Sequence, residues 1–212
     1  MLDCLVGSEM CIRDSSYIRQ KWRIKDKSLE SRSIPKNITQ VYTLSPGADF
    51  NRKSKKDFNL LLSKFNFAID KGFSEVGLLF DDIDINNIGI ESDNKDLGKF
   101  HGELISEVTT KLGLSRGWFC PSIYCQSFSK KGIQNDKYLE GVSEIINNDL
   151  FFLWTGPKVI SDFISQDHLK ELGQVIKNPV VIWDNFYAND YCPSRLFLGD
   201  ITGRDFFRGN PY

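Results

Sequence analysis

Long apolar runs, an overall excess of basic residues and ordered cysteine pairs are all missing from this sequence. No hydrophobic run among its 212 residues approaches the roughly 20 residues that a membrane-spanning helix needs. The 27 Lys and Arg residues nearly balance the 28 Asp and Glu residues, which leaves a net charge of −1. Proteins that bind nucleic acids or anionic membranes usually carry a basic excess. The sequence therefore predicts no nucleic-acid and no membrane partner.

The five cysteines indicate neither a disulfide framework nor a zinc site. Cys4 and Cys11 lie near the start, and the other three, Cys120, Cys125 and Cys192, are odd in number and lack CxxC spacing. We expect free, partly buried thiols, which favour a reducing location such as the cytoplasm. No metal or organic cofactor is expected.

Residues 1–15 differ in character from the rest of the chain. They show neither helical period nor strand alternation, and they contain the only two methionines, Met1 and Met10. The string CLVGSEMCIRDS resembles a translated transposon-end adapter from sequencing libraries. We therefore expect residues 1–15 to be a non-native adapter-like segment, and residues 16–212 to be one incomplete domain of a longer gene product.

The body of the chain alternates short apolar runs with segments of helical spacing. The runs predict strands, and the intervening segments, over about residues 58–69, 97–112, 138–146 and 169–176, predict amphipathic helices. Unbroken apolar strands are buried on both faces, which is typical of a parallel α/β sheet or barrel. The predicted strands are Val41–Leu44, Val76–Phe80, Trp118–Cys120, Leu150–Trp154 and Val180–Trp183.

The positions of glycine and of polar residues favour a barrel over a doubly wound sheet. No glycine-rich phosphate loop follows any predicted strand, whereas polar residues follow the carboxyl end of each. In (β/α)₈ barrels the active site is assembled at that rim. The predicted fold class is therefore α/β, a partial (β/α)₈ TIM barrel with about five of eight strand–helix units.

The acidic run Asp81-Asp82-Ile83-Asp84 follows the second predicted strand. Adjacent carboxylates repel, so one is pushed toward protonation while its neighbour stays charged. An acid beside an anion suits glycosidic cleavage, and immediate neighbours fit a substrate-assisted route better than a two-carboxylate site with its separation of about 5 Å or more. A solvated acidic loop and a Mg²⁺ site are the alternatives. Asp84 is expected to cap a turn or to support its neighbours.

Several aromatic residues lie beside polar groups, a mixture that suits a carbohydrate pocket. Sugar rings stack on aromatic faces, while amides and carboxylates bind hydroxyl groups. These aromatic residues are Tyr124, Trp154, Trp183, Tyr187 and Tyr191. Trp154 lies inside an apolar run and is expected in the core instead. His101 and His168 fall on predicted helices away from the strand ends, where we expect surface or half-buried side chains.

Four ordered motifs resemble those of the catalytic domain of glycoside hydrolase family 84. This family includes the protein O-GlcNAcases and the bacterial β-N-acetylglucosaminidases long labelled hyaluronidases. The similarity extends over residues 42–204. The motifs are Gly77–Asp84, Phe119–Cys125, Trp154–Val159, and Val181–Asn185 followed by Ala188–Tyr191.

The resemblance implies hydrolysis of terminal β-linked N-acetylglucosamine by a substrate-assisted, retaining mechanism. It implies that Asp81 orients the 2-acetamido group, that Asp82 is the general acid and base, and that Tyr124 hydrogen-bonds at the reacting centre. The implied acetamido pocket and sugar contacts are Cys120, Thr155, Val159, Trp183, Asn185 and Asp190.

The resemblance also implies that parts of the family's site are missing. Sugar contacts of its first, second and eighth strands find no counterpart here, so the chain is expected to hold strands three to seven and to have little or no activity alone. The substrate stays open between an O-GlcNAc protein and a GlcNAc-bearing glycan. The alternative function is a non-catalytic carbohydrate- or protein-binding module on the same barrel.

Overall fold

Five parallel strands form one sheet whose spatial order follows the chain. The computed structural model describes residues 39–47, 50–81, 95–146, 149–187 and 202–205. The sheet order is β1-β2-β3-β4-β5, and every neighbouring pair is parallel. The strands are β1 (Val41–Leu44), β2 (Glu75–Leu79), β3 (Gly117–Cys120), β4 (Leu150–Trp154) and β5 (Val180–Ile182). The segment predicted to be adapter-like, residues 1–15, lies outside the described residues.

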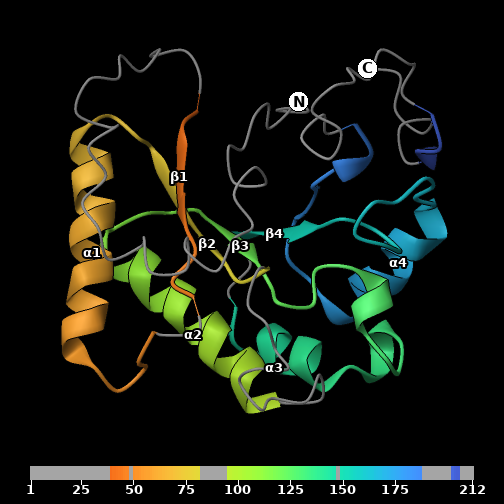
Figure 1. The fold of residues 1–212 in the computed structure, drawn as a ribbon, viewed down its shortest axis with the longest axis horizontal. Coiled ribbons are helices and arrows are strands. Elements are labelled where there is room, and N and C mark those ends of the chain that lie inside the picture. Colours follow the sequence, from red (N-terminus) through yellow and green to blue (C-terminus); the bar gives the residue numbers. More distant parts are fainter. Residues whose placement is uncertain (1–38, 48–49, 82–94, 147–148, 188–201, 206–212) are drawn as a thin grey trace.

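One α-helix connects each strand to the next. The helices are α1 (Lys55–Asp70), α2 (Lys95–Lys111), α3 (Lys137–Ile145) and α4 (Gln166–Val175). They follow one another around one side of the sheet, from α1 at the left through α2 and α3 to α4 at the right (Figure 1). A doubly wound sheet would reverse its strand order. The sequential order is that of a barrel wall, which confirms the predicted fold class.

Local capping explains where the helices begin and end. The side chains of Ser54, Asp136 and Ser165 accept hydrogen bonds from backbone N–H groups in the first turns of α1, α3 and α4. Gly113 follows α2 with a φ of +66°, a conformation that glycine adopts without steric cost. Within the described ranges, no helix is long and apolar enough to cross a membrane.

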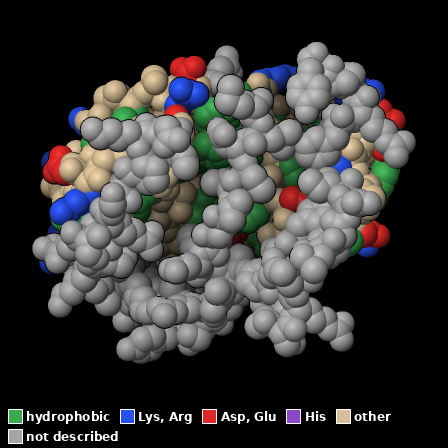
Figure 2. Space-filling model, turned by 90° about the horizontal axis from the view of Figure 1, so that it is seen from above, with side chains coloured by type: hydrophobic (Ala, Val, Ile, Leu, Met, Phe, Trp, Pro, Cys, Tyr) green, Lys and Arg blue, Asp and Glu red, His purple; other side chains and the backbone are tan. Residues whose placement is uncertain are grey.

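The two faces of the sheet carry different apolar clusters because side chains alternate along a strand. Phe119, Phe152 and Trp154 belong to the large core between the sheet and the helices. Their neighbours Cys120 and Leu153 belong to a second cluster on the opposite face, which we call the inner face. In the view from above, hydrophobic side chains are visible toward the middle, and side chains of both charges lie around the outline (Figure 2).

Helices α2 and α3 approach each other so closely at two glycines that backbone meets backbone there. A Cβ atom added at Gly98 would lie 2.1 Å from the Tyr138 carbonyl oxygen, and one added at Gly141 would lie 2.1 Å from the Lys95 carbonyl oxygen. The two glycines therefore allow a close helix crossing. Lys95 also forms ion pairs across the same contact with carboxylates of α3.

Both described histidines are buried, so the expectation of surface or half-buried side chains is wrong. His101 is 3% exposed, and its ring stacks on Phe80 with a centroid distance of 3.8 Å. His101 Nδ1 lies 2.9 Å from Tyr138 Oη. His168 Nε2 accepts a hydrogen bond from Trp154 Nε1 at 2.9 Å. Both rings act as uncharged core residues, because each faces an aromatic neighbour and not solvent.

Acid is expected to destabilise the fold through His101. Burial lowers the pKa of this side chain from 6.5 to about 3. Between these values the unfolded chain binds a proton that the folded protein does not bind. The contribution of uncharged His101 to the free energy of unfolding is complete above about pH 6.5. Below that pH it declines by up to about 1.4 kcal/mol per pH unit. Imidazole NMR signals of His101 that titrate near pH 6.5 in the folded protein would contradict this.

Candidate active site

The carboxyl ends of β2 to β5 meet at one edge of the sheet. Parallel pairing continues one residue beyond the strands, because Phe80 N–H donates to the Cys120 carbonyl and Trp183 N–H donates to the Trp154 carbonyl, each at 2.9 Å. Asp81 lies two residues after the end of β2, and Thr155 follows β4 directly. The pairing therefore brings the predicted residues of four strand ends to the same edge.

Hydrogen bonds join the loop after β3 to the loop after β4. Thr155 N–H donates to the Tyr124 carbonyl at 2.9 Å, and Gln126 N–H donates to the Gly156 carbonyl at 3.0 Å. The Thr155 hydroxyl donates to the Lys158 carbonyl at 2.8 Å. These bonds fix the backbone of Tyr124, whose ring packs edge-on against Phe128. Thr155 thus fixes the backbone of both loops through its N–H and hydroxyl groups, and its side chain is also a predicted pocket residue.

Three of the predicted pocket residues share the inner face. Cys120 is 2% exposed and lies in the inner-face cluster, with the half-buried rings of Tyr124 and Trp183 packed against it. Cys120 and Cys125 are free and buried, as expected for these two thiols. The cluster and the two partly exposed aromatic rings form an apolar surface on the inner face.

Asn185 contributes a buried amide to the same edge. Its side chain donates from Nδ2 to the Val159 carbonyl at 3.0 Å. Asn185 is 8% exposed, and its Oδ1 accepts no hydrogen bond from the described part of the chain. A buried carbonyl oxygen without a donor costs free energy, which a bound ligand with an N–H or O–H group would recover. The Oδ1 atom is therefore a candidate ligand acceptor.

Of the two carboxylates predicted to be catalytic, only Asp81 lies within the described residues. Asp81 is half-buried at the end of β2, beside the β3 strand end. Asp82 and Asp190 lie outside the described residues, so their placement at the site stays a prediction. Among the described residues, no group of three or more His, Cys, Asp or Glu side chains is arranged to hold a metal ion.

The aromatic residues divide between the site edge and the core. Trp154 is fully buried in the core between sheet and helices, which confirms the expectation for it. Tyr187 ends a short 3₁₀ helix, η6 (Asn185–Tyr187), just after β5. Tyr191 lies outside the described residues.

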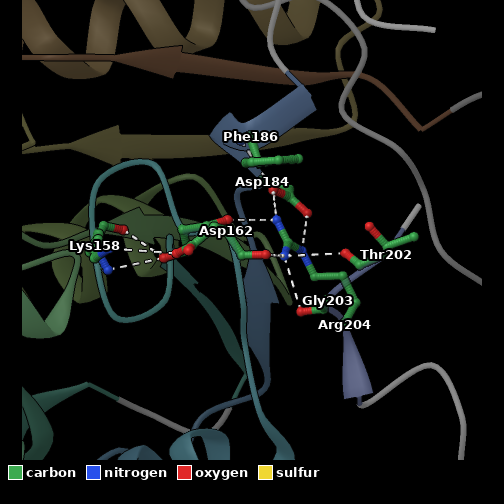
Figure 3. Close-up of polar contacts among 8 residues, drawn as sticks. Lys158, Asp162, Asp184, Phe186, Thr202, Gly203 and Arg204 are labelled. Atoms are coloured by element: carbon green, nitrogen blue, oxygen red, sulfur yellow. Dashed lines mark hydrogen bonds and ion pairs between the residues drawn. The ribbon is translucent and has the colours of Figure 1, made fainter. Parts of the chain in front are cut away.

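Arg204, which no sequence pattern indicated, forms several side-chain hydrogen bonds at this edge. Its guanidinium binds the Asp184 carboxylate with two hydrogen bonds of 2.7 Å (Figure 3). Asp184 lies two residues after the end of β5 and directly precedes Asn185. No local pattern marks Arg204, because its partner lies 20 residues earlier in the chain.

Comparisons with known proteins agree with the motifs. A family model described as beta-N-acetylglucosaminidase matches residues 14–206. The protein O-GlcNAcases of Rattus norvegicus and Mus musculus are each 36% identical over 171 residues, which cover 79% of this chain and 18% of theirs. The chain thus spans about a fifth of the length of these relatives.

A solved structure has a similar fold. A mutant O-GlcNAc hydrolase from Thermobaculum terrenum superposes with a TM-score of 0.71 at 22% identity. The match covers 91% of this chain and 44% of that structure. At this identity the similarity shows a common fold.

Proposed function

The chain belongs to the β-N-acetylglucosaminidase family, glycoside hydrolase family 84, and from this we propose that it carries the catalytic centre of an enzyme that hydrolyses terminal β-linked N-acetylglucosamine. The observation that supports the proposal is the shared edge of the sheet, where Asp81 lies after β2 and the segments of Cys120, Thr155 and Asn185 end the neighbouring strands. Asp82 is the next residue in the chain after Asp81. The substrate is a GlcNAc-bearing glycan or an O-GlcNAc protein.

The reaction proceeds in two steps with the substrate's own amide as nucleophile. In the first step, the acetamido oxygen bonds to the anomeric carbon, the glycosidic bond breaks, and Asp82 gives its proton to the leaving oxygen. Asp81 accepts a hydrogen bond from the acetamido N–H and so stabilises the positive charge that develops on the amide. In the second step, water attacks the anomeric carbon and Asp82 takes a proton from it, the bond between this carbon and the acetamido oxygen breaks to restore the amide, and the sugar leaves with retained configuration.

The other residues bind and orient the sugar. Cys120, Thr155, Val159 and Trp183 wall the acetamido pocket, where the half-buried Trp183 ring supplies an apolar surface. Tyr124 hydrogen-bonds at the reacting centre, and the buried Asn185 Oδ1 accepts a hydrogen bond from the ligand. Asp190 binds sugar hydroxyl groups. Holding the amide against the anomeric carbon makes the attack intramolecular, which removes much of its entropic barrier.

The 212-residue chain alone is expected to show little or no turnover. The described strands form five of the eight that a closed (β/α)₈ barrel needs, and active sites of such barrels draw on several strand ends. The complete protein, with eight strands, is expected to release N-acetylglucosamine from an aryl β-N-acetylglucosaminide. Measuring turnover for both proteins under the same conditions tests this. Sugar binding by calorimetry without hydrolysis in the complete protein would favour a binding module and contradict the proposal.

A further inference from the structure

Arg204 joins three chain segments at the site edge through a buried guanidinium. Its side chain is 1% exposed and binds the Asp184 carboxylate through Nε and Nη2. The Nη2 atom also donates to the Ser161 carbonyl at 2.8 Å, and Nη1 donates to the Asp162 and Gly203 carbonyls at 3.1 Å each (Figure 3). One side chain therefore fixes the end of β5, the loop after β4 and its own segment.

The loop after β4 is also held at its other end. The Thr155 hydroxyl donates to the Lys158 carbonyl, and the Ser161 hydroxyl bonds with the backbone of Lys158 at 3.0 Å. A Cβ atom added at Gly156 would lie 2.7 Å from Ser161 Oγ, so the loop folds tightly on itself. Val159 lies between these points and cannot shift without breaking bonds on one side.

Asp184 transmits the same restraint to Asn185. Asp184 Oδ1 accepts a hydrogen bond from Phe186 N–H at 3.2 Å. The carboxylate held by Arg204 therefore bridges the two neighbours of Asn185 in the chain. The Arg204 guanidinium also lies over the Phe186 ring, 5.5 Å from its centroid. Asn185 in turn donates to the Val159 carbonyl. Val159 and Asn185 thus contact each other between the two segments that Arg204 ties together.

We propose that Arg204 is a positioning residue that sets the size of the acyl pocket, and through it the discrimination between N-acetyl and larger N-acyl sugars. The inference rests on the proposed function, which assigns Val159 and Asn185 to that pocket. Arg204 itself does not contact the sugar. Bidentate binding of a carboxylate needs the planar guanidinium, and a lysine cannot reproduce it. Without this bidentate contact, the end of β5 and the loop after β4 can move apart, which widens the pocket.

The experiment compares kcat/KM for aryl β-glycosides of N-acetyl- and N-propionyl-glucosamine in the complete protein. One added methylene in a fitted pocket changes kcat/KM by about 10-fold or more. Arg204→Lys and Asp184→Asn are each expected to lower the acetyl-to-propionyl preference about ten-fold. A matched control is Arg116→Met, because Arg116 is largely exposed and pairs with Glu75 at the opposite end of the strands. The control is expected to keep the wild-type preference.

The ratio distinguishes positioning from a purely structural role. A variant that only destabilises the fold lowers the active fraction for both substrates equally, so its ratio stays at the wild-type value. If the wild-type protein is active and both Asp184→Asn and Arg204→Lys keep its acetyl-to-propionyl ratio, the inference about Arg204 is overturned. The proposed function then still stands. If Arg204→Lys does not fold, the ratio for Asp184→Asn decides. A wild-type protein inactive on both substrates overturns the proposed function and the inference with it.

Discussion

Asp82→Asn in the complete protein is expected to lower kcat by about 10²–10⁴-fold on substrates with poor leaving groups. The amide cannot give a proton to the departing oxygen. Substrates whose leaving group is already acidic need less protonation, so their loss is expected to be much smaller. A series of aryl β-N-acetylglucosaminides with graded phenol pKa values measures this dependence. An equal loss across the series would contradict the assignment of Asp82 as the general acid.

Asp81→Asn serves as the comparison for the first carboxylate. In the proposed mechanism Asp81 acts on the acetamido group rather than on the leaving oxygen, so the fall in kcat is expected to be similar for every phenol in the series. A matched control is Asp167→Asn, because Asp167 is exposed in the first turn of α4 and pairs with Lys170. Exposed ion pairs contribute little, so the control is expected to retain wild-type kcat.

Gly98→Ala is expected to destabilise the complete protein by about 3 kcal/mol, and Gly141→Ala by a similar amount. In each variant the new methyl group meets a carbonyl oxygen of the facing helix at 2.1 Å, and backbone has no rotamer with which to move away. Helices α2 and α3 must therefore separate. Their separation also disturbs the His101–Tyr138 pair, whose hydroxyl accepts the Ser122 N–H beside the active-site edge.

Gly173→Ala is the matched control for both variants. Gly173 lies inside α4, and beyond its chain neighbours and the nearby backbone of its own helix nothing lies within 4 Å of the position that its Cβ would take. Alanine is favoured over glycine in a helix by about 0.5–1 kcal/mol, so this variant is expected to be slightly more stable. Urea denaturation of the three variants measures the differences. Equal midpoints for Gly98→Ala and Gly173→Ala would show that the helices do not meet through backbone.

The strands were predictable because they are unbroken apolar runs, and the three central strands, β2 to β4, are buried on both faces. Unbroken apolar runs located β1 and β4 at their observed bounds, and the other three strands to within one residue at each end. The sequential order followed from polar residues after each strand and from the absence of a phosphate loop. Gly72 and Gly113 lie just after α1 and α2, and both have positive φ.

The parts that escaped prediction depend on contacts between distant residues. His101 looked like a helix-surface residue because nothing in its own helix shows that Phe80 stacks on it. Arg204 contacts Asp162 and Asp184, 42 and 20 residues earlier, and no spacing rule links them. Strand ends located the candidate site, whereas the individual roles of its residues came from the family resemblance.

The nucleophilic role of the substrate's acetamido group is the central claim, and fluorination of that group tests it most directly. The complete protein would be given matched aryl β-glycosides with N-acetyl and N-trifluoroacetyl groups. Fluorine withdraws electrons from the amide oxygen, so a mechanism in which this oxygen attacks the anomeric carbon predicts that kcat/KM falls by at least about ten-fold, equivalent to ~1.4 kcal/mol in the barrier. Equal kcat/KM values for the two substrates would contradict substrate assistance and favour an enzyme nucleophile.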